Sequence, residues 1–243
     1  MPPMPADTSG FAPYFHSCQV QPAIDPDFMQ RIFALRYQVY CVECAFLDAA
    51  QFSSPHETDL YDSRSAHFCA FNLAGELVGY VRLVHAESGQ KFPFQSHCPL
   101  DLTDTAQPAR AHTAEISRLM VRQDYRRRRH DNLAGVTVHD SDAAPAREKR
   151  RNTPQILLSL YRQMYTHSLR VGIRHWYAAM EPPLARVLTR MNFGFVQVGP
   201  PSDYYGLVAP YLADLRELEA QIGQHQPPLL AWLRQAQTPW RPV

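Results

Sequence analysis

The order in which helix-like and strand-like segments alternate restricts the fold of this chain more than any other feature of its sequence. Residues 25–39 carry apolar side chains at the spacing of one helix face, and Asp25 and Pro26 favour a helix start there. Residues 67–71 and 77–84 alternate like strands around a short turn and predict an antiparallel hairpin. The later predicted elements are a strand at 114–121, a helix at 153–172, a strand at 175–180, a helix at 182–192, strands at 193–198 and 204–208, and helices at 212–222 and 229–235. This order predicts a mixed α+β fold around one sheet.

Three stretches differ in composition from the rest of the predicted domain, which covers residues 25–235. The first 24 residues combine prolines with small polar residues and predict an extended N-terminal arm. Residues 122–153 hold nine lysines and arginines against five acidic residues and predict a mobile basic insertion. Residues 236–243 are a short tail. We therefore expect a single domain with one basic insertion and two appendages.

Charge, hydropathy and cysteine content exclude several classes of protein. The 243 residues carry a net charge of +1 at pH 7, so a globally basic nucleic-acid-binding protein is not indicated. No apolar run reaches the roughly 18 residues that a membrane-spanning helix needs, and residues 1–15 lack the basic and apolar parts of a secretory signal. Five cysteines are an odd number, which argues against a disulfide scaffold. We expect a cytoplasmic protein without a transmembrane segment.

Seven short stretches along the chain together resemble one family. They are Arg36–Leu47, Glu57–Asp62, Val81–Val84, His97–Leu100, Ala114–Arg118, His175–Arg186 and Ala209–Leu212. Their sequences are similar to those of the acyltransferases associated with PEP-CTERM/exosortase systems. Those proteins resemble N-acyl amino acid synthases and are related to acyl-homoserine lactone synthases within the GNAT superfamily. The resemblance covers about residues 25–235 and implies a GNAT-like α+β fold, a mixed and mostly antiparallel sheet flanked by helices.

The resemblance implies an enzyme that moves a fatty acyl chain from a thioester to an amine. The donor would be acyl-phosphopantetheine on acyl carrier protein, or acyl-CoA, and the acceptor would be the amine of an amino acid or a related small molecule. Neither a permanently bound cofactor nor a metal is implied. Two rival enzymes are an acyl-homoserine lactone synthase and an acetyl-CoA-dependent N-acetyltransferase. A non-enzyme alternative is a nucleic-acid-binding module that uses the basic insertion.

The resemblance also implies which residues form the site. Six positions match the functional pattern of the lactone synthases: Arg36, Asp59, Asp62, Arg82, Glu115 and Arg118. The residues expected to bind the donor or its carrier are Leu119, Val121, Arg126, Arg127, Arg128 and Arg129. GNAT enzymes that use acetyl-CoA usually have glycines where this chain has its four arginines, and the backbone amides there hold the cofactor diphosphate. The arginines are either a solvated cluster or a docking site for an acidic carrier protein with a single phosphate.

Glu115 and Arg118 lie three residues apart on the strand predicted at 114–121. A carboxylate beside the acceptor can take its proton, and Glu115 is our candidate for this general base. The alternative is an ion pair between the two residues that only stabilises the sheet. Strict alternation would put them on opposite faces, whereas a bulge would bring both to one face and free backbone amides for the developing oxyanion. The tyrosine that many GNAT enzymes use as general acid falls near Leu188, so no residue is assigned to protonate the leaving thiolate.

The remaining charged site residues stand in contrasting sequence contexts. Asp59 and Asp62 lie in a polar loop, where they either bind the ammonium group of an amino acid or are solvated turn residues. Arg36 and Arg82 lie on elements with an apolar pattern, where an arginine normally needs a partner. We expect these arginines to pair with Asp59, Asp62 or Glu115. Binding of an acceptor carboxylate by one of them is the alternative.

Cysteine and aromatic residues complete the candidates. Cys41 and Cys44 are spaced like half of a zinc site, but two further ligands would be needed, so we expect them to be buried small apolar residues. Four aromatic residues belong either to the core or to the wall of an acyl tunnel: Tyr161, Tyr165, Trp176 and Tyr177.

Overall fold

One sheet with both parallel and antiparallel pairs organises the molecule. The structure is a computed structural model that describes residues 11, 15–101, 107–125, 147–237 and 240, with the backbone alone for residues 147–154. Within these residues the strands are β1 Phe15–Val20, β2 Ser65–Asn72, β3 Leu77–His85, β4 Thr113–Val121, β5 His175–Met180, β6 Val196–Gln197, β7 Ser202–Asp203 and β8 Leu207–Asp214. Their order across the sheet is β1-β2-β3-β4-β5-β8-β6, and β7 also pairs with β8. The pair β4–β5 is parallel and the other pairs are antiparallel, which confirms the predicted α+β fold.

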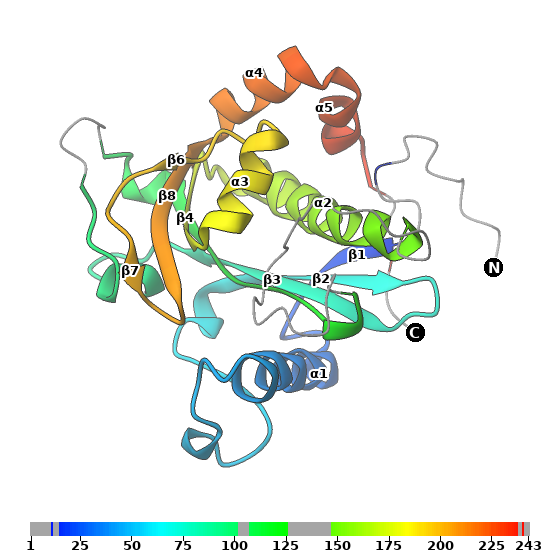
Figure 1. Ribbon diagram of the computed structural model, residues 1–243, viewed down its shortest axis with the longest axis vertical. Coiled ribbons are helices and arrows are strands. Elements are labelled where there is room, and N and C mark those ends of the chain that lie inside the picture. The colour runs from blue at the N-terminus through cyan, green and yellow to red at the C-terminus, as the bar shows by residue number, and fades with distance from the viewer. Residues whose placement is uncertain (1–10, 12–14, 102–106, 126–146, 238–239, 241–243) are drawn as a thin grey trace.

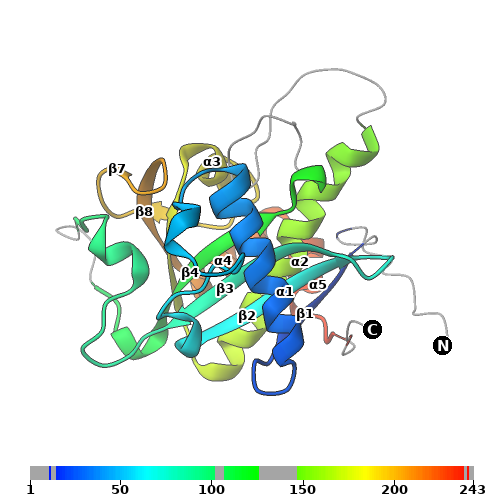
Figure 2. The same ribbon diagram turned by 90° about the horizontal axis from the view of Figure 1, so that it is seen from below.

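Helices cover both faces of this sheet (Figure 1). The α-helices of the described chain are α1 Pro26–Tyr37, α2 Arg147–Val171, α3 Pro182–Arg190, α4 Leu215–His225 and α5 Pro227–Arg234. Figure 2 shows α1 in front of the sheet and α2 behind it, on the same side as α3, α4 and α5. A π-helix, η1 Gln38–Glu43, continues α1, and the short 3-10 helices are η2 Ala49–Gln51, η3 Asp62–Arg64, η4 Pro93–Ser96, η5 Arg110–His112 and η6 Gln123–Tyr125. None of the helices described is both long enough and apolar enough to cross a bilayer.

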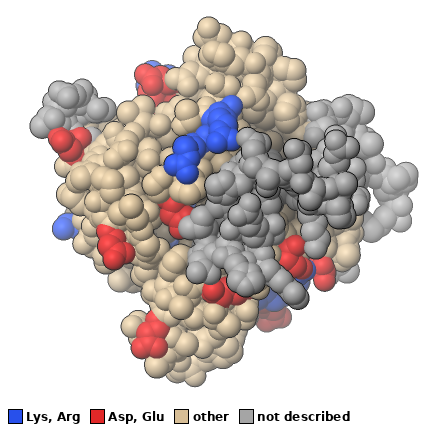
Figure 3. All heavy atoms as spheres, viewed as in Figure 1, with Lys and Arg blue, Asp and Glu red and all other residues tan. Residues whose placement is uncertain are grey.

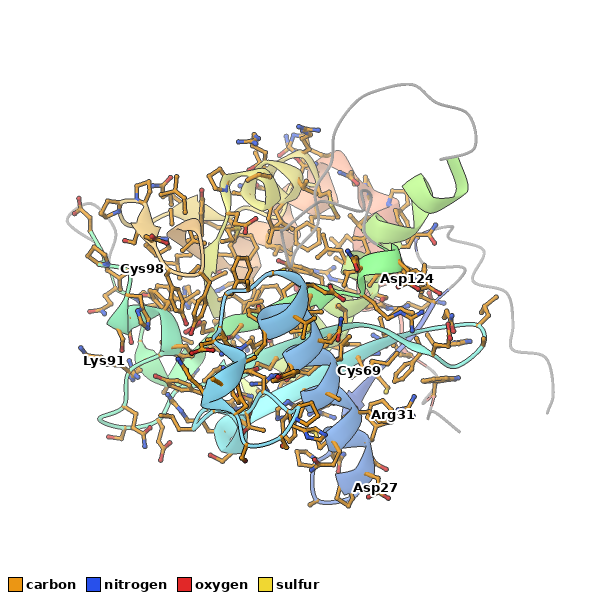
Figure 4. The ribbon with its side chains drawn as sticks, turned by 60° about the horizontal axis from the view of Figure 1, so that its bottom comes forward. Asp27, Arg31, Cys69, Lys91, Cys98 and Asp124 are labelled. Atoms are coloured by element: carbon orange, nitrogen blue, oxygen red, sulfur yellow. The ribbon has the colours of Figure 1, made fainter. Side chains whose placement is uncertain are left out.

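The two faces of the sheet bury separate apolar clusters. The larger cluster packs α2, α4 and α5 onto strand residues that include Ala114, Ile116 and Trp176. The smaller cluster packs α1 and η1 onto β2, β3 and Met120, on the side that comes forward in Figure 4. A third cluster joins the segment around Phe94 to β5 and β8. The pleat explains the division, because successive residues of a strand point to opposite faces.

Strand β4 contains a bulge at Arg118. This residue has a φ of +55°, a left-handed conformation that residues other than glycine seldom adopt. Beyond the pair formed by Arg82 and Ser117, a single residue of β3 stands opposite two residues of β4. The bulge brings Arg118 to the face that Glu115 and Ser117 already occupy. A bulge is the predicted condition for bringing Glu115 and Arg118 to one face, and the structure contains it.

The parallel pairing of β4 with β5 stops partway along both strands. It runs from Thr113 opposite His175 to Ile116 opposite Ala178, while both strands continue beyond the last pair. The two strands are therefore free to diverge at their C-terminal ends, next to the bulge.

The structure differs from the sequence-based expectation at both ends of the chain. Within the segment expected to be an arm, Phe15–Val20 forms the edge strand β1, because Phe15 and Val20 are buried against the rest of the sheet. In the expected tail, the ring of Trp240 lies 5.0 Å from that of His16 and 4.6 Å from that of Phe71, measured between centroids. Both segments thus contribute to the packed part of the molecule.

Two predicted boundaries inside the chain also move. Helix α2 begins at Arg147, before the predicted start at Thr153, so it includes the end of the expected basic insertion; residues 126–146 lie outside the described residues. The helix predicted from Leu212 was wrong in its first residues, because β8 continues to Asp214. Proline is rare in inner strands, so the presence of Pro210 made β8 hard to predict as a strand. The carbonyl oxygen of Pro210 nevertheless accepts a hydrogen bond from the N–H of Val198 at 2.9 Å.

Candidate active site

Three arginines and three acidic residues form an ion network on the α1 face of the sheet. Its members are Arg36 from α1, Arg82 from β3, Arg118 from β4, and Glu57, Asp59 and Asp62 from the segment that leads into η3. Arg36 donates to Glu57 and to Asp62, each at 2.5 Å. Arg82 donates to Asp59 through both terminal nitrogens at 2.6 Å and to Asp62 at 2.7 Å. Arg118 completes the network with bonds to Glu57 at 2.9 Å and to Asp59 at 3.3 Å.

The network is buried and electrically balanced. Arg36 and Arg82 have no exposed surface, and Glu57 is 1% exposed. Burial opposes the ionisation of Glu57, but the charges of Arg118 and Arg36 outweigh it and lower its pKa to about 2. The pKa of Asp59 is also lowered to about 2, because Arg82 and Arg118 outweigh burial there. Each charge has a partner of opposite sign, as a buried charge requires.

The ion network bears on the two alternatives for Arg36 and Arg82, which are pairing with acidic residues and binding of an acceptor carboxylate. Both pair with Asp62, and Arg82 also pairs with Asp59, as expected, while neither forms an ion pair with Glu115. Both guanidinium groups are fully buried in these ion pairs, although Arg36 Nη2 and Arg82 Nε have no hydrogen-bond partner among the described residues. Asp59 and Asp62 are likewise bonded to arginines and are not solvated turn residues.

A pocket of about 110 Å³ opens where β4 and β5 diverge. Its walls come from both strands, from the start of α3, from η1 and the residues after it, and from the turn between β7 and β8. Aromatic rings line much of it: Tyr40, Phe46, Tyr161, Tyr204 and Tyr205. The charged residues at its wall are Glu115, Arg118 and Glu181. A pocket therefore leads to the predicted general base.

Glu115 lies at the wall of this pocket and forms no ion pair with any arginine that the structure describes. Its side chain is 2% exposed, and one carboxyl oxygen accepts the backbone N–H of Phe94 at 3.2 Å. Burial raises the pKa of Glu115 to about 8, although that N–H and the charges of Arg82 and Arg118 act in the opposite direction. Arg118 shares its face but is bonded to Glu57 and Asp59 instead, so the alternative of a Glu115–Arg118 ion pair does not hold. A carboxyl group with a pKa near the working pH is suited to proton transfer.

The other predicted site residues divide between the pocket and the core. Leu119 lines the pocket. Val121 is fully buried in the cluster beneath α2, because the bulge turns Leu119 and Val121 toward that side. Leu188, at the position expected for a GNAT tyrosine, also belongs to this core. Arg126, Arg127, Arg128 and Arg129 lie outside the described residues.

The aromatic and cysteine candidates are separated by the fold. Tyr161 lines the pocket, whereas Tyr165, Trp176 and Tyr177 are buried core residues. Of the two cysteine candidates, Cys41 is buried and Cys44 is half-buried, both at the end of η1. Two further cysteines lie apart from each other in Figure 4, Cys69 in the cluster beside α1 and Cys98 in the third cluster. Among the described residues, no three His, Cys, Asp or Glu side chains are grouped closely enough to hold a metal ion.

Sequence reasoning missed several residues of the site. Glu57 stands two positions before Asp59, and this spacing within the polar loop was its only signal. Tyr40 was hidden because η1 is a π-helix, which buries the consecutive residues Val39, Tyr40 and Cys41 and breaks the helical period. Tyr205 has a φ of +57°, a strained conformation typical of functional sites but invisible in sequence.

Arg118 also contacts the aromatic wall of the pocket. Its guanidinium carbon lies 5.0 Å from the ring centroid of Tyr40 and 5.8 Å from that of Tyr205. The ring of Tyr204 stacks on His97 at 4.1 Å and lies 4.4 Å from Tyr205. Arg118 thus links the ion network to the pocket, since cations pack well on aromatic faces.

Comparison with known proteins identifies the fold. Residues 35–135 match a family model described as an acetyltransferase (GNAT) domain. No protein with a curated description matches the chain. Among solved structures, BjaI, a CoA-dependent acyl-homoserine lactone synthase with SAM and isopentyl-CoA, is 17% identical and has a TM-score of 0.60. The match covers 90% of this chain and 98% of BjaI.

Two further structures show the same likeness. TofI, in a ternary complex with an inhibitor and MTA, is 19% identical with a TM-score of 0.57, over 90% of this chain and 95% of its own. FeeM, an N-acyl amino acid synthase from uncultured soil microbes, is 15% identical with a TM-score of 0.50, over 85% and 94%. The chain therefore has the GNAT-like fold. The domain match and the fold confirm the prediction of an N-acyltransferase enzyme.

Proposed function

We propose that this protein transfers a fatty acyl chain from the phosphopantetheine thioester of an acyl carrier protein to the amine of an amino acid or a related acceptor. The observation that carries the proposal is the pocket between the diverging ends of β4 and β5, with Glu115 at its wall. A thioester placed there has an acid–base group on one side and aromatic walls around it.

The reaction assigns a different task to each part of the site. The amine nitrogen attacks the thioester carbonyl, a C–N bond forms, the C–S bond breaks, and the thiolate leaves. Glu115 accepts a proton from the attacking nitrogen, an effect typically worth about 10²- to 10⁴-fold in rate. Backbone amides at the Arg118 bulge are our candidates for binding the developing oxyanion. The ion network organises the loop and strands around these groups and takes no part in proton transfer.

The choice of carrier protein over CoA rests on basic residues. The run from Arg126 to Arg129 takes the place of a glycine-bearing diphosphate loop. On α3, beside the pocket residues Glu181 and Leu184, Arg186 and Arg190 are exposed, and Figure 3 shows basic side chains gathered over this helix. An acidic carrier protein complements such a surface. Since BjaI is CoA-dependent, acyl-CoA is the alternative donor, and an acyl-homoserine lactone the alternative product.

The family assignment can be carried one step further as a proposal. The seven matching sequence stretches support a place among the acyltransferases of PEP-CTERM/exosortase systems, in the cytoplasm. The product would then be an N-acyl amino acid or a related amide.

Mass spectrometry tests the proposal directly. Lipid extracts from cells that overproduce the protein should contain an acyl amide that is absent when Glu115→Gln is overproduced at the same level. In vitro, purified protein should release thiol from acyl carrier protein thioesters when the identified amine is added, and more slowly from the matching acyl-CoA. If no thioester of any chain length releases thiol, and the protein instead binds DNA or RNA with a steep salt dependence, it is a nucleic-acid-binding module.

A further inference from the structure

A second carboxyl group, that of Glu181, lies at the same pocket as Glu115. It directly follows β5, and its backbone is extended, with φ −71° and ψ 149°. The alternation of β5 therefore continues through it, and Glu181 shares a face with Tyr177 and Ala179. Tyr177 is the residue of β5 that stands opposite Glu115. Both carboxyl groups thus belong to one face of the diverging strands.

Glu181 occupies a helix-capping position without capping the helix. It is the N-cap residue of α3, yet its side chain makes no hydrogen bond to the first amides of that helix. Within the described residues its carboxylate forms neither an ion pair nor a hydrogen bond. Burial alone raises the pKa of Glu181 to about 7. Its charge contributes, after burial, to raising the pKa of Cys44 to about 11, which places the carboxylate near the end of η1.

The charges around the pocket do not balance. Of the described residues that line it, two are acidic and one is basic. The basic residue, Arg118, is already bonded to Glu57 and Asp59 of the ion network. Among the described residues neither Glu115 nor Glu181 has a cationic partner, so a positively charged ligand group would stabilise the ionised form of their carboxyl groups. The aromatic walls of the pocket suit such a group as well.

The two carboxyl groups lie at different depths. Four residues of extended chain separate the level of Glu115 from Glu181, which corresponds to roughly 13 Å. Glu115 is almost fully buried, whereas Glu181 is half-buried and stands at the open side. A ligand that enters the pocket from solvent meets Glu181 first.

We propose that Glu181 binds the ammonium group of the acceptor, so that the pocket selects a positively charged primary amine. This inference rests on the proposed function and adds a residue to it. An ammonium ion must lose two protons to become an amide nitrogen. The first passes to Glu181 and then to water, which leaves a free amine that moves inward to the thioester beside Glu115; the second leaves as the C–N bond forms and reaches the departing thiolate sulfur by way of Glu115.

Binding of simple amines tests the inference without turnover. Ligand-observed NMR titrations should show that the wild-type protein binds benzylammonium at least fivefold more tightly than benzyl alcohol, which has the same ring and no charge. Glu181→Gln should bind the two probes equally, and Glu181→Asp should keep part of the preference. Glu217→Gln, which changes an exposed residue of α4, is the matched control and should behave like the wild type. Equal binding of both probes by the wild-type protein would overturn the inference.

Steady-state kinetics then separates this inference from the proposed function. With an amine that the wild-type enzyme acylates, Glu181→Gln should raise the KM for the amine at least tenfold and leave the KM for the thioester within twofold. An unchanged amine KM, or a lower Tm without any change in binding or KM, would show that Glu181 is only structural. If the binding preference is present but no amine is ever acylated, the ammonium site stands and the proposed function fails.

Discussion

The molecule holds two sets of buried acidic residues that differ in their partners. Glu57 forms ion pairs with two arginines and Asp59 with three, and their pKa values are lowered to about 2. Within the described part of the chain Glu115 and Glu181 form no ion pair with an arginine, and burial raises their pKa values to about 8 and about 7. Glu57 and Asp59 therefore stay ionised near neutral pH, whereas Glu115 and Glu181 can take up and release protons there.

Because both sets are at least partly buried and differ in their arginine partners, burial alone does not identify a catalytic carboxylate. A carboxylate surrounded by arginines cannot take up a proton near neutral pH, and it serves to fix the chain. A buried carboxyl group that lacks a cation is costly when ionised, and such groups are typical of functional sites. The contrast between carboxylates with and without arginine partners can be tested by mutation and by changes of pH.

Removal of one arginine from the ion network should destabilise the fold strongly. Arg36→Met leaves Glu57 without one of its two arginines and Asp62 with Arg82 alone, and breaking a buried ion pair costs about 3–5 kcal/mol. Urea unfolding of the variant measures this loss. Arg31→Met on the same helix is the control, because Arg31 is exposed and forms no ion pair with the other described residues. A loss no larger than that of the control would mean that the network does not support the fold.

Replacement of Glu115 should lower activity strongly without lowering the stability of the fold. Glu115→Gln removes the general base, so turnover should fall at least about 10²-fold. Its free energy of unfolding at pH 8 should equal or exceed that of the wild type, because the variant no longer buries an ionisable group there. Thiol-release kinetics and urea unfolding on the same preparation give both numbers. Unchanged turnover would remove Glu115 from the mechanism.

The two sets should also respond to pH in opposite directions. Because the folded-state pKa values of Glu57 and Asp59 are lowered, their stabilisation is complete above about pH 4.5 and is lost as the pH falls toward 2. Because the folded-state pKa of Glu115 is raised, the fold loses stability as the pH rises from about 4.5 through 8. Unfolding curves across this range should show the full alkaline loss in the wild type and only the smaller part due to Glu181 in Glu115→Gln, while both keep the acid loss. The kcat/KM of the wild type should rise with pH up to about 8.

The arginines proposed to dock the carrier offer the mildest test, because the chemical step does not use them. Reversal of Arg126–Arg129 to glutamate should raise the KM for acyl carrier protein thioesters several-fold and spare a short pantetheine thioester. The same reversal at Arg186 and Arg190 should have a smaller effect in the same direction, because two charges change instead of four. Equal losses on both donors would show that the arginines do not dock the carrier.

Much of the fold and the charged part of the site could be predicted from the sequence. Apolar periodicity located α1, the β2–β3 hairpin, β5 and α3, and the pairing of Arg36 and Arg82 with acids followed from the cost of a buried unpaired charge. Glu181 could not be predicted in the same way, because its role depends on where β5 ends beside another strand. Most of β8 was not predicted as a strand, because Pro210 argues against an inner strand.

The bulge at Arg118 has a consequence for how this chain can vary in length. Because one extra residue stands between Ser117 and the end of β4, every side chain that follows points to the face opposite the one a regular strand would give it. Deletion of Arg118 itself would remove the extra residue, so Leu119 would follow Ser117 directly and both Leu119 and Met120 would stay on the faces they now occupy. A one-residue deletion in a regular part of the strand would instead invert every side chain on one side of it.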